Sequence, residues 1–87
     1  MEVLRVASKT EAKAVANAIA SIMSKGHAKL EMESIGAGAL NEAVKGVIIA
    51  RGMLTTQGIE LKVIPSFINK EVDGILKTGI KLLVTSE

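Results

Sequence analysis

The stretch SIGAGALNEAVKGVIIARG, residues 34–52, marks a change from a strand to a helix. Residues 28–33, directly before it, alternate between apolar and charged, as in a strand with one buried face that ends near Ile35. Gly36 and Gly38 then predict a tight turn. A helix is predicted behind the turn, because apolar residues recur there at helical spacing: Leu40, Ala43, Val44, Val47 and Ile48. Gly52 is expected to end this helix.

The N-terminal part of the chain has the same order of strand and helix. Residues 3–7 alternate in character and predict a short strand. Ser8 and Glu11 fit a capping box, which predicts that a helix begins directly after Ser8. Gly26 is expected to end this helix. Its apolar positions are Ala12, Val15, Ala16, Ile19, Ile22 and Met23.

Two further strands are expected on the C-terminal side. Apolar and charged residues alternate over residues 59–63, and Pro65 either ends the pairing of this strand or marks the strand as a sheet edge. Residues 70–77 predict a hairpin connection, and residues 80–85 predict the last strand. The expected order is therefore β-α-β-α-β-β.

This order predicts an α/β two-layer sandwich, with both helices on one face of a four-stranded sheet. Right-handed crossovers place the two helices on the same side of the sheet. The strands have one apolar and one polar face, which favours two layers over three. The uncovered face is expected to carry solvated charges of both signs: Arg5, Lys29, Glu31, Glu33, Glu60, Lys62 and Lys81.

The composition excludes several classes of function. With 48% apolar residues, the chain of residues 1–87 is expected to form one folded domain and not a disordered segment. Cysteine is absent, which excludes disulfides, thiolate catalysis and cysteine-ligated metals. His27 is the sole histidine and Phe67 the sole aromatic residue, so histidine metal sites and base stacking on aromatic platforms are not expected either. We expect no cofactor.

The sequence also predicts where the protein is found. The longest stretch without a charged residue, 14–24, is eleven residues long, whereas a membrane span needs about 18. The N-terminus does not combine a basic start with an apolar core, so a secretory signal is not expected. The lack of cysteine suits a reducing compartment. We therefore expect a cytoplasmic protein that does not contact a membrane.

Groups suited to catalysis are sparse. The carboxylates of Glu31 and Glu33 share a strand face, and those of Glu71 and Asp73 share the hairpin connection, but neither pair has a histidine beside it. Acid–base catalysis needs a titratable group with a perturbed pKa in a cleft, and no part of the pattern indicates one. We therefore expect a protein without enzymatic activity.

The basic residues are the candidates for contact with a polyanion. The net charge of +2 permits such a partner without requiring it. A phosphate backbone needs several cations but no fixed spacing between them. Lys9 is the strongest candidate, because it follows the expected helix N-cap, where backbone N–H groups also favour anions. The full set comprises Arg5, Lys9, Lys13, Lys45, Arg51, Lys70 and Lys77.

The glycine-rich turn has a second interpretation. It superficially matches the dinucleotide fingerprint G-x-G-x-x-G, but Asn41 stands at the third glycine and the chain is too short for a dinucleotide-binding fold. Free N–H groups at the start of a helix nevertheless attract anions. A small-anion or nucleotide site formed by Gly36, Ala37, Gly38 and Asn41 therefore remains an alternative.

Residues 34–52 resemble the central signature of the stage V sporulation protein S family. Shorter matching stretches at 2–9, 14–20, 63–67 and 78–82 extend the resemblance over nearly the whole chain. That family is similar in fold to the Alba proteins, small chromatin and RNA binders with the order β-α-β-α-β-β. The resemblance implies a mixed sheet with strand order 1-2-4-3 and an antiparallel last strand.

The resemblance also implies a function. It implies binding of nucleic acid, either DNA or RNA, by a dimer or tetramer with a regulatory role in sporulation. Alba proteins carry lysines in the loop between the first strand and the first helix, and Lys9 is the residue that matches here. They also favour a basic residue before the second helix and a basic hairpin. This sequence has no basic residue in residues 36–38 and a hairpin of mixed charge.

Two functional hypotheses follow. The first is a nucleic-acid-binding regulator that contacts the phosphate backbone as an oligomer, and the second is a protein-interaction or small-anion module that uses the turn at residues 36–41. Self-association as a homodimer or homotetramer is expected, because several apolar residues exceed what the core needs. These residues are Ile49, Met53, Leu54, Ile64, Phe67, Ile68 and Leu83.

Overall fold

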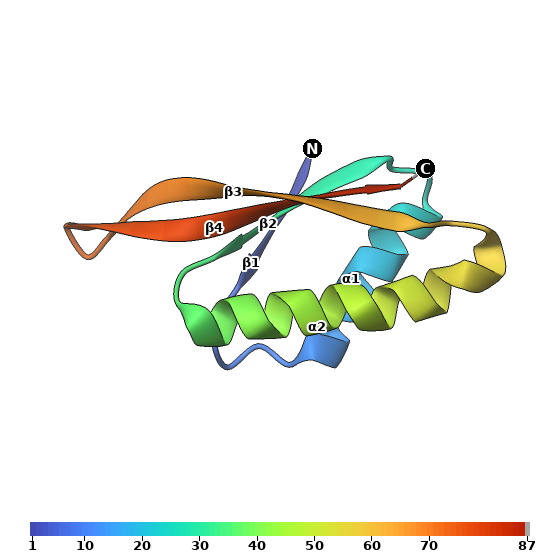
Figure 1. Ribbon diagram of the computed structural model, residues 1–87, viewed down its shortest axis with the longest axis horizontal. Helices are drawn as coiled ribbons and strands as arrows, with labels where there is room; N and C mark the ends of the chain where they lie inside the picture. Colours follow the sequence, from blue (N-terminus) through green and yellow to red (C-terminus); the bar gives the residue numbers. More distant parts are fainter. Residues whose placement is uncertain (87) are drawn as a thin grey trace.

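The computed structural model describes residues 1–86, so that only Glu87 of the expected domain lies outside the described residues. The order β-α-β-α-β-β is confirmed, with one short 3₁₀ helix added (Figure 1). The elements are β1 (Glu2–Val6), α1 (Ala12–Ser24), β2 (Lys29–Ser34), α2 (Ala37–Leu54), η1 (Thr55–Gln57), β3 (Leu61–Val72) and β4 (Ile75–Ser86).

The four strands form one mixed sheet in the order β1-β2-β4-β3. Strands β1 and β2 are parallel, whereas β4 is antiparallel to both β2 and β3. Both helices cover the same face of this sheet (Figure 1). The predicted two-layer sandwich and the strand order implied by the resemblance are therefore confirmed.

The core lies between the sheet and the two helices. Strand β2 contributes Leu30 and Met32, and β4 contributes Leu82 and Val84, all buried. Burial of each such side chain stabilises the fold by about 1.5–3 kcal/mol. Helix α1 packs over these side chains with residues that its apolar spacing predicted, and Ala20 is buried in addition. The buried residues of α1 are Val15, Ala16, Ile19, Ala20 and Met23.

The buried face of α2 is only partly the one predicted: Ala43 is buried, and Leu40 and Val47 are half-buried against the core. Its large residues Val44 and Ile48 are exposed, by 42% and 64%. The buried residues are mainly small: Ala39, Ala43, Gly46, Ala50 and Leu54. A Cβ on Gly46 would lie 2.5 Å from Cγ1 of Val15, so the small face allows α2 to pack closely on α1. Close helix packing therefore determines which side of α2 faces inward.

The start of α1 also differs from the prediction. The helix begins at Ala12, and Glu11 at its N-cap makes no side-chain capping bond. The backbone N–H of Ala7 instead donates to Oγ1 of Thr10, at 3.0 Å, and closes a turn before the helix. The capping box at Ser8 is therefore wrong, and Lys9 lies in this turn and not beside a helix N-cap.

The ends of the helices show where glycine acts as a stop. Gly26, with φ of 93°, follows α1 as predicted. Gly52 does not end α2, which continues to Leu54 and passes into η1. The chain turns instead at Gly58, whose φ of 71° suits glycine.

Strands β3 and β4 are much longer than predicted and form a projecting hairpin. Pro65 lies inside β3, which is tolerated because β3 is an edge strand. The turn consists only of Asp73 and Gly74, both with positive φ, as in a type I′ turn. Strand β2 ends opposite Ile80, so residues 68–72 and 75–79 pair only with each other. This paired arm extends beyond the rest of the sheet (Figure 1).

Candidate nucleic-acid interface

An open cleft of about 590 Å³ lies at the base of the projecting hairpin. The end of β1 and the turn after it form one side of the cleft, β2 contributes to it, and the hairpin forms the other side. The cleft thus brings together segments that are far apart in the sequence. Its lining residues are Arg5, Val6, Ala7, Ser8, Glu33, Ile35, Ile68, Lys70, Glu71, Val72 and Lys77.

Glu33 holds two of the cations in this cleft. It alternates with the buried residues Met32 and Ser34 on β2, so its side chain lies on the sheet face that the helices leave uncovered. Nε of Arg5 lies 3.7 Å from Oε1 of Glu33, and Nζ of Lys70 lies 3.1 Å from the same oxygen. The Glu33 side chain is only 15% exposed, whereas that of Arg5 is 74% exposed. The arginine therefore remains accessible to a ligand.

Lys70 and Lys77 are directly opposite each other across the hairpin. Opposite residues of an antiparallel pair share a face, and like charges in that position repel. Within residues 1–86, Lys70 bonds to Glu33, and no ion pair is found for Lys77. Three cations and two carboxylates, including Glu71, thus line the cleft, which leaves it with a positive charge.

Two more of the predicted residues lie near the start of α1. Lys9 is exposed in the turn after β1, and its neighbour Ser8 lines the cleft. Lys13 is exposed in the first turn of the helix. Neither lysine forms an ion pair within the described part of the chain, so both are accessible to a polyanion.

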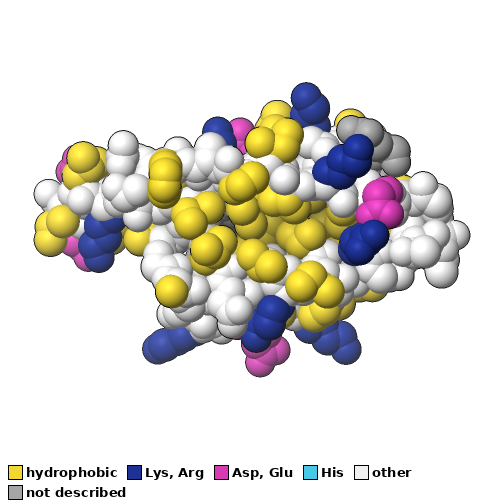
Figure 2. All heavy atoms as spheres, viewed as in Figure 1, with side chains coloured by type: hydrophobic (Ala, Val, Ile, Leu, Met, Phe, Trp, Pro, Cys, Tyr) yellow, Lys and Arg dark blue, Asp and Glu magenta, His cyan; other side chains and the backbone are white. Residues whose placement is uncertain are grey.

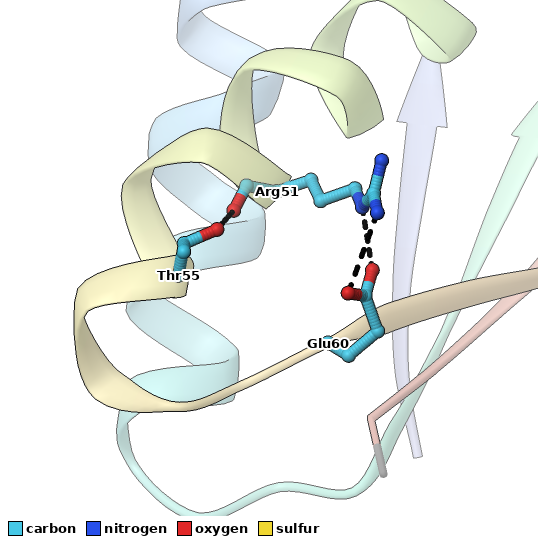
Figure 3. Close-up of polar contacts among 3 residues, drawn as sticks. All are labelled: Arg51, Thr55 and Glu60. Atoms are coloured by element: carbon cyan, nitrogen blue, oxygen red, sulfur yellow. Dashed lines mark hydrogen bonds and ion pairs between the residues drawn. The ribbon is translucent and has the colours of Figure 1, made fainter.

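The two predicted cations of α2 do not join the cleft. Nζ of Lys45 lies 2.9 Å from the carboxylate of Glu42, one turn earlier on the helix. Arg51 holds Glu60 through both Nε and Nη2, and its carbonyl accepts a hydrogen bond from the Thr55 hydroxyl (Figure 3). Glu60 was expected on the uncovered sheet face, but this contact directs it toward α2.

The contact between Arg51 and Glu60 changes the pKa of both side chains. The hydrogen bond from Arg51 lowers the pKa of the Glu60 carboxyl below its ordinary value. The same hydrogen bond raises the pKa of the Arg51 guanidinium. Each charge therefore stabilises the other, and the pair ties the segment before β3 to the last turns of α2.

The glycine-rich turn adjoins the charged cleft without lining it: a Cβ on Gly38 would lie 3.2 Å from Cβ of Ser8, a lining residue of the cleft. Gly36 is the N-cap of α2, with φ of 93°, and Ala37, Gly38 and Asn41 are exposed. A hollow of about 330 Å³ beside this turn is mostly apolar and has no basic side chain in its lining. Its lining residues are Ser34, Gly36, Ala37, Leu40, Phe67, Thr78, Gly79 and Ile80.

Exposed hydrophobic side chains gather between α2 and β3, as Figure 2 shows. Phe67 is 81% exposed on β3, and Ile48 is 64% exposed on α2. Ile49, Met53 and Ile64, which were expected to exceed the needs of the core, are exposed as well. Leu54 corrects that expectation, because it is fully buried and belongs to the core.

Sequence reasoning missed the central residue of the cleft. The sequence places Glu33 on the uncovered face with Arg5, Glu31 and Lys81, and pairs it with Glu31 as a poor candidate for catalysis, but does not indicate a role in binding cations. Cross-strand ion pairs form on this face between Arg5 and Glu33 and between Lys81 and Glu31. The link to Lys70 was not foreseen, since it depends on the length of the hairpin. Alternation along the expected strand indicated only that Glu33 and Arg5 share a sheet face, and the strand register brings them together.

Residues 1–86 contain no cluster of acidic or histidine side chains that would hold a metal ion. No helix in this part of the chain has the length and apolar character needed to cross a bilayer.

Comparison with known proteins agrees with the architecture. The family model of stage V sporulation protein S matches residues 2–87, which confirms the resemblance found in the sequence. Alba from Thermoplasma volcanium is similar in structure, with a TM-score of 0.66, 12% identity, and coverage of 99% of this chain and 99% of that chain. ALBA1 from Trypanosoma brucei has a TM-score of 0.62 and 19% identity, with coverage of 98% of this chain and 69% of that chain. At these identities the two structures establish the fold alone.

Proposed function

We propose that this chain, which belongs to the stage V sporulation protein S family, is a non-enzymatic regulatory protein that binds DNA or RNA in the cytoplasm. The observation that carries the proposal is the cleft at the hairpin base, where Arg5, Lys70 and Lys77 converge beside the turn that holds Lys9. Such a grouping of cations suits the phosphates of a nucleic-acid backbone. The resemblance described above points to the same class of ligand.

The shape of the hairpin supports binding along a backbone. The arm formed by residues 68–79 projects beyond the sheet, so it is able to follow a groove that a flat sheet face does not reach. No aromatic side chain lines the cleft, and recognition of bases by stacking is therefore not expected there. Contacts with phosphate carry little sequence information, so we expect weak sequence preference and steep salt dependence.

Self-association is part of the proposal. Phe67 on β3 lies beside Leu40 of α2 and is exposed, and Ile48 on α2 is exposed as well. Large exposed apolar patches mark interaction sites. Closed two-fold symmetry is the usual arrangement for copies of one chain. A homodimer or homotetramer would present the cleft two or four times to one nucleic acid, which raises the overall affinity through multivalent binding.

A salt-titrated binding experiment tests this function. Fluorescence anisotropy with a short DNA duplex and a single-stranded RNA compares the parent with the double variant Lys9→Ala and Lys70→Ala. We expect the double variant to bind both ligands more weakly and with a lower salt slope, by about one for each phosphate that the variant no longer neutralises. Lys25→Ala is the control, because this exposed lysine lies at the C-terminal end of α1. Equal binding by parent and double variant at low salt contradicts the proposed surface.

A second candidate function rests on the hollow beside Gly36. Its apolar lining and the exposed ring of Phe67 suit an apolar segment of a partner protein better than a small anion. A Leu40→Ser variant, which changes the half-buried side chain in this lining, distinguishes the two functions. Under the leading proposal this variant binds nucleic acid as the parent does.

A further inference from the structure

Glu33 carries a carboxylate oxygen at which two cations of the cleft meet. Arg5 Nε and Lys70 Nζ both approach Oε1, at 3.7 Å and 3.1 Å. These two cations come from different strands, and their side chains remain 74% and 40% exposed. The carboxylate is fixed by its place on β2, the strand between β1 and β4. Its position is therefore determined by the sheet, whereas both cations are able to turn toward solvent.

A phosphate group and the Glu33 carboxylate need the same partners. Each presents anionic oxygens that accept charge-assisted hydrogen bonds from guanidinium and ammonium groups. Lys77, opposite Lys70 on the hairpin, adds a cation with no ion pair within residues 1–86. A phosphate that enters the cleft thus meets Lys77 unopposed, but competes with Glu33 for Lys70 and Arg5.

We infer that Glu33 is a built-in competitor of phosphate, which occupies Arg5 and Lys70 in the free protein and thereby limits the affinity for nucleic acid. The inference rests on the proposed function and adds to it the residue that sets binding strength. Binding transfers the two cations from the carboxylate to phosphate. Because the internal pairs must break first, their attraction offsets part of the electrostatic gain of binding.

Removal of the Glu33 charge tests the inference. Glu33→Gln keeps the size of the side chain and removes its charge, so Arg5 and Lys70 become available to phosphate. We expect this variant to bind the DNA duplex and the RNA about three- to tenfold more tightly than the parent, with a salt slope steeper by about one to two. Anisotropy titrations at several salt concentrations measure both quantities.

Glu31→Gln is the matched control. Glu31 lies two residues earlier on the same strand and face, and its carboxylate lies 3.8 Å from Nζ of Lys81. It does not line the cleft. Both variants change the net charge of the protein equally, so any effect of net charge alone appears in both. Only Glu33→Gln frees cations of the cleft, and only it is expected to steepen the salt slope.

A double-mutant cycle shows whether Glu33 acts through Lys70. In a Lys70→Gln background, Glu33→Gln is expected to gain less than in the parent, because Arg5 is then the one cleft cation that it releases. Thermal unfolding followed by circular dichroism reports whether each variant is folded. Glu33→Asp provides a second test that keeps the charge: its shorter side chain withdraws the carboxylate, and we expect affinity between that of the parent and that of Glu33→Gln.

The outcomes separate the inference from the function on which it rests. Tighter binding by Glu33→Gln than by Glu31→Gln supports the inference, including the case in which the parent binds too weakly to measure. Binding by the parent with equal affinities of the two variants overturns the inference and leaves the proposed function intact. No binding by the parent or by any of the variants overturns the proposed function itself.

Discussion

The basic residues at the hairpin base and those on α2 differ in how carboxylates balance their charges. On α2, Lys45 has the carboxylate of Glu42 and Arg51 has that of Glu60, so each cation has its own partner. At the hairpin base, Arg5 and Lys70 share one carboxylate, and Lys77 has none within residues 1–86. A basic residue therefore contributes to anion binding according to its local balance of charge and not according to its type.

The largest expected effect tests this comparison directly. A triple variant with Arg5, Lys70 and Lys77 changed to Ala removes the unbalanced cations, and we expect it to bind DNA and RNA about a hundredfold more weakly at moderate salt. The control is the double variant Lys45→Ala and Arg51→Ala, which removes paired cations and is expected to change affinity by no more than about threefold. Anisotropy measures both, and equal reductions in affinity would contradict the distinction between the two regions.

The apolar surface beside α2 leads to the second prediction. Phe67→Asp places a charge on the exposed apolar surface between α2 and β3, and we expect the dissociation constant of self-association to rise by more than about tenfold. Analytical ultracentrifugation measures this constant. Thr56→Asp, an equally charged change on the exposed 3₁₀ helix, is the control. A parent that is monomeric at high micromolar concentration contradicts the proposed assembly.

Replacement of Lys9 tests at a single position whether an unpaired cation beside the cleft contributes to binding. It is exposed beside the cleft and forms no ion pair within the described residues. We expect Lys9→Ala to weaken binding a few-fold, about equally for all sequences, and to lower the salt slope by about one. The melting temperature is expected to stay close to that of the parent, because surface substitutions change stability little. A change confined to one nucleic-acid sequence would contradict backbone contact.

The smallest expected effect concerns the pair of Arg51 and Glu60. Because the pKa of the Glu60 carboxyl is lowered in the folded protein, its contribution to stability is present above the ordinary glutamate value of about 4.3 and is lost as the pH falls through the lower folded value. Glu60→Gln should therefore have a slightly lower melting temperature than the parent at neutral pH. This difference should vanish in acid, as thermal unfolding at several pH values will show. A difference that persists in strong acid contradicts the assignment to this carboxylate.

The sequence patterns predicted most of the architecture. Alternation over residues 28–35 and helical spacing over residues 12–23 identified β2 and α1, because each element has one face in the core and one in solvent. The prediction for α2 was wrong at Val44 and Ile48, because the inner face consists mainly of alanine and glycine, whose burial leaves no strong hydrophobic signal. Pro65 and the mixed charges of residues 70–77 resembled a loop, since an edge strand of a projecting hairpin is not required to be apolar.

The candidate site was predicted in its parts and not as a whole. Arg5, Lys70 and Lys77 were all named from the sequence, but so were Lys45 and Arg51, whose charges are matched on α2. Helical spacing alone places Glu42 one turn before Lys45, so that pair is visible in the local sequence. The partner of Arg51 lies after the helix and the partner of Lys70 lies on another strand, so those two contacts are not. Alternation placed Glu33 on the same sheet face as Arg5, but the pairing of β1 with β2 sets them side by side, and the second contact requires the hairpin to extend past β2.

Composition and periodicity thus established the order of the elements, the two layers and the pool of basic residues, because each of these depends on neighbours along the chain. The inner face of α2, the length of the hairpin and the meeting of Arg5 and Lys70 at Glu33 were determined only in three dimensions. The contact between α1 and α2 and the meeting of charges in the cleft join residues distant in sequence. The hairpin pairs residues that are close in sequence, but the mixed polarity of residues 70–77 does not show that they pair as strands.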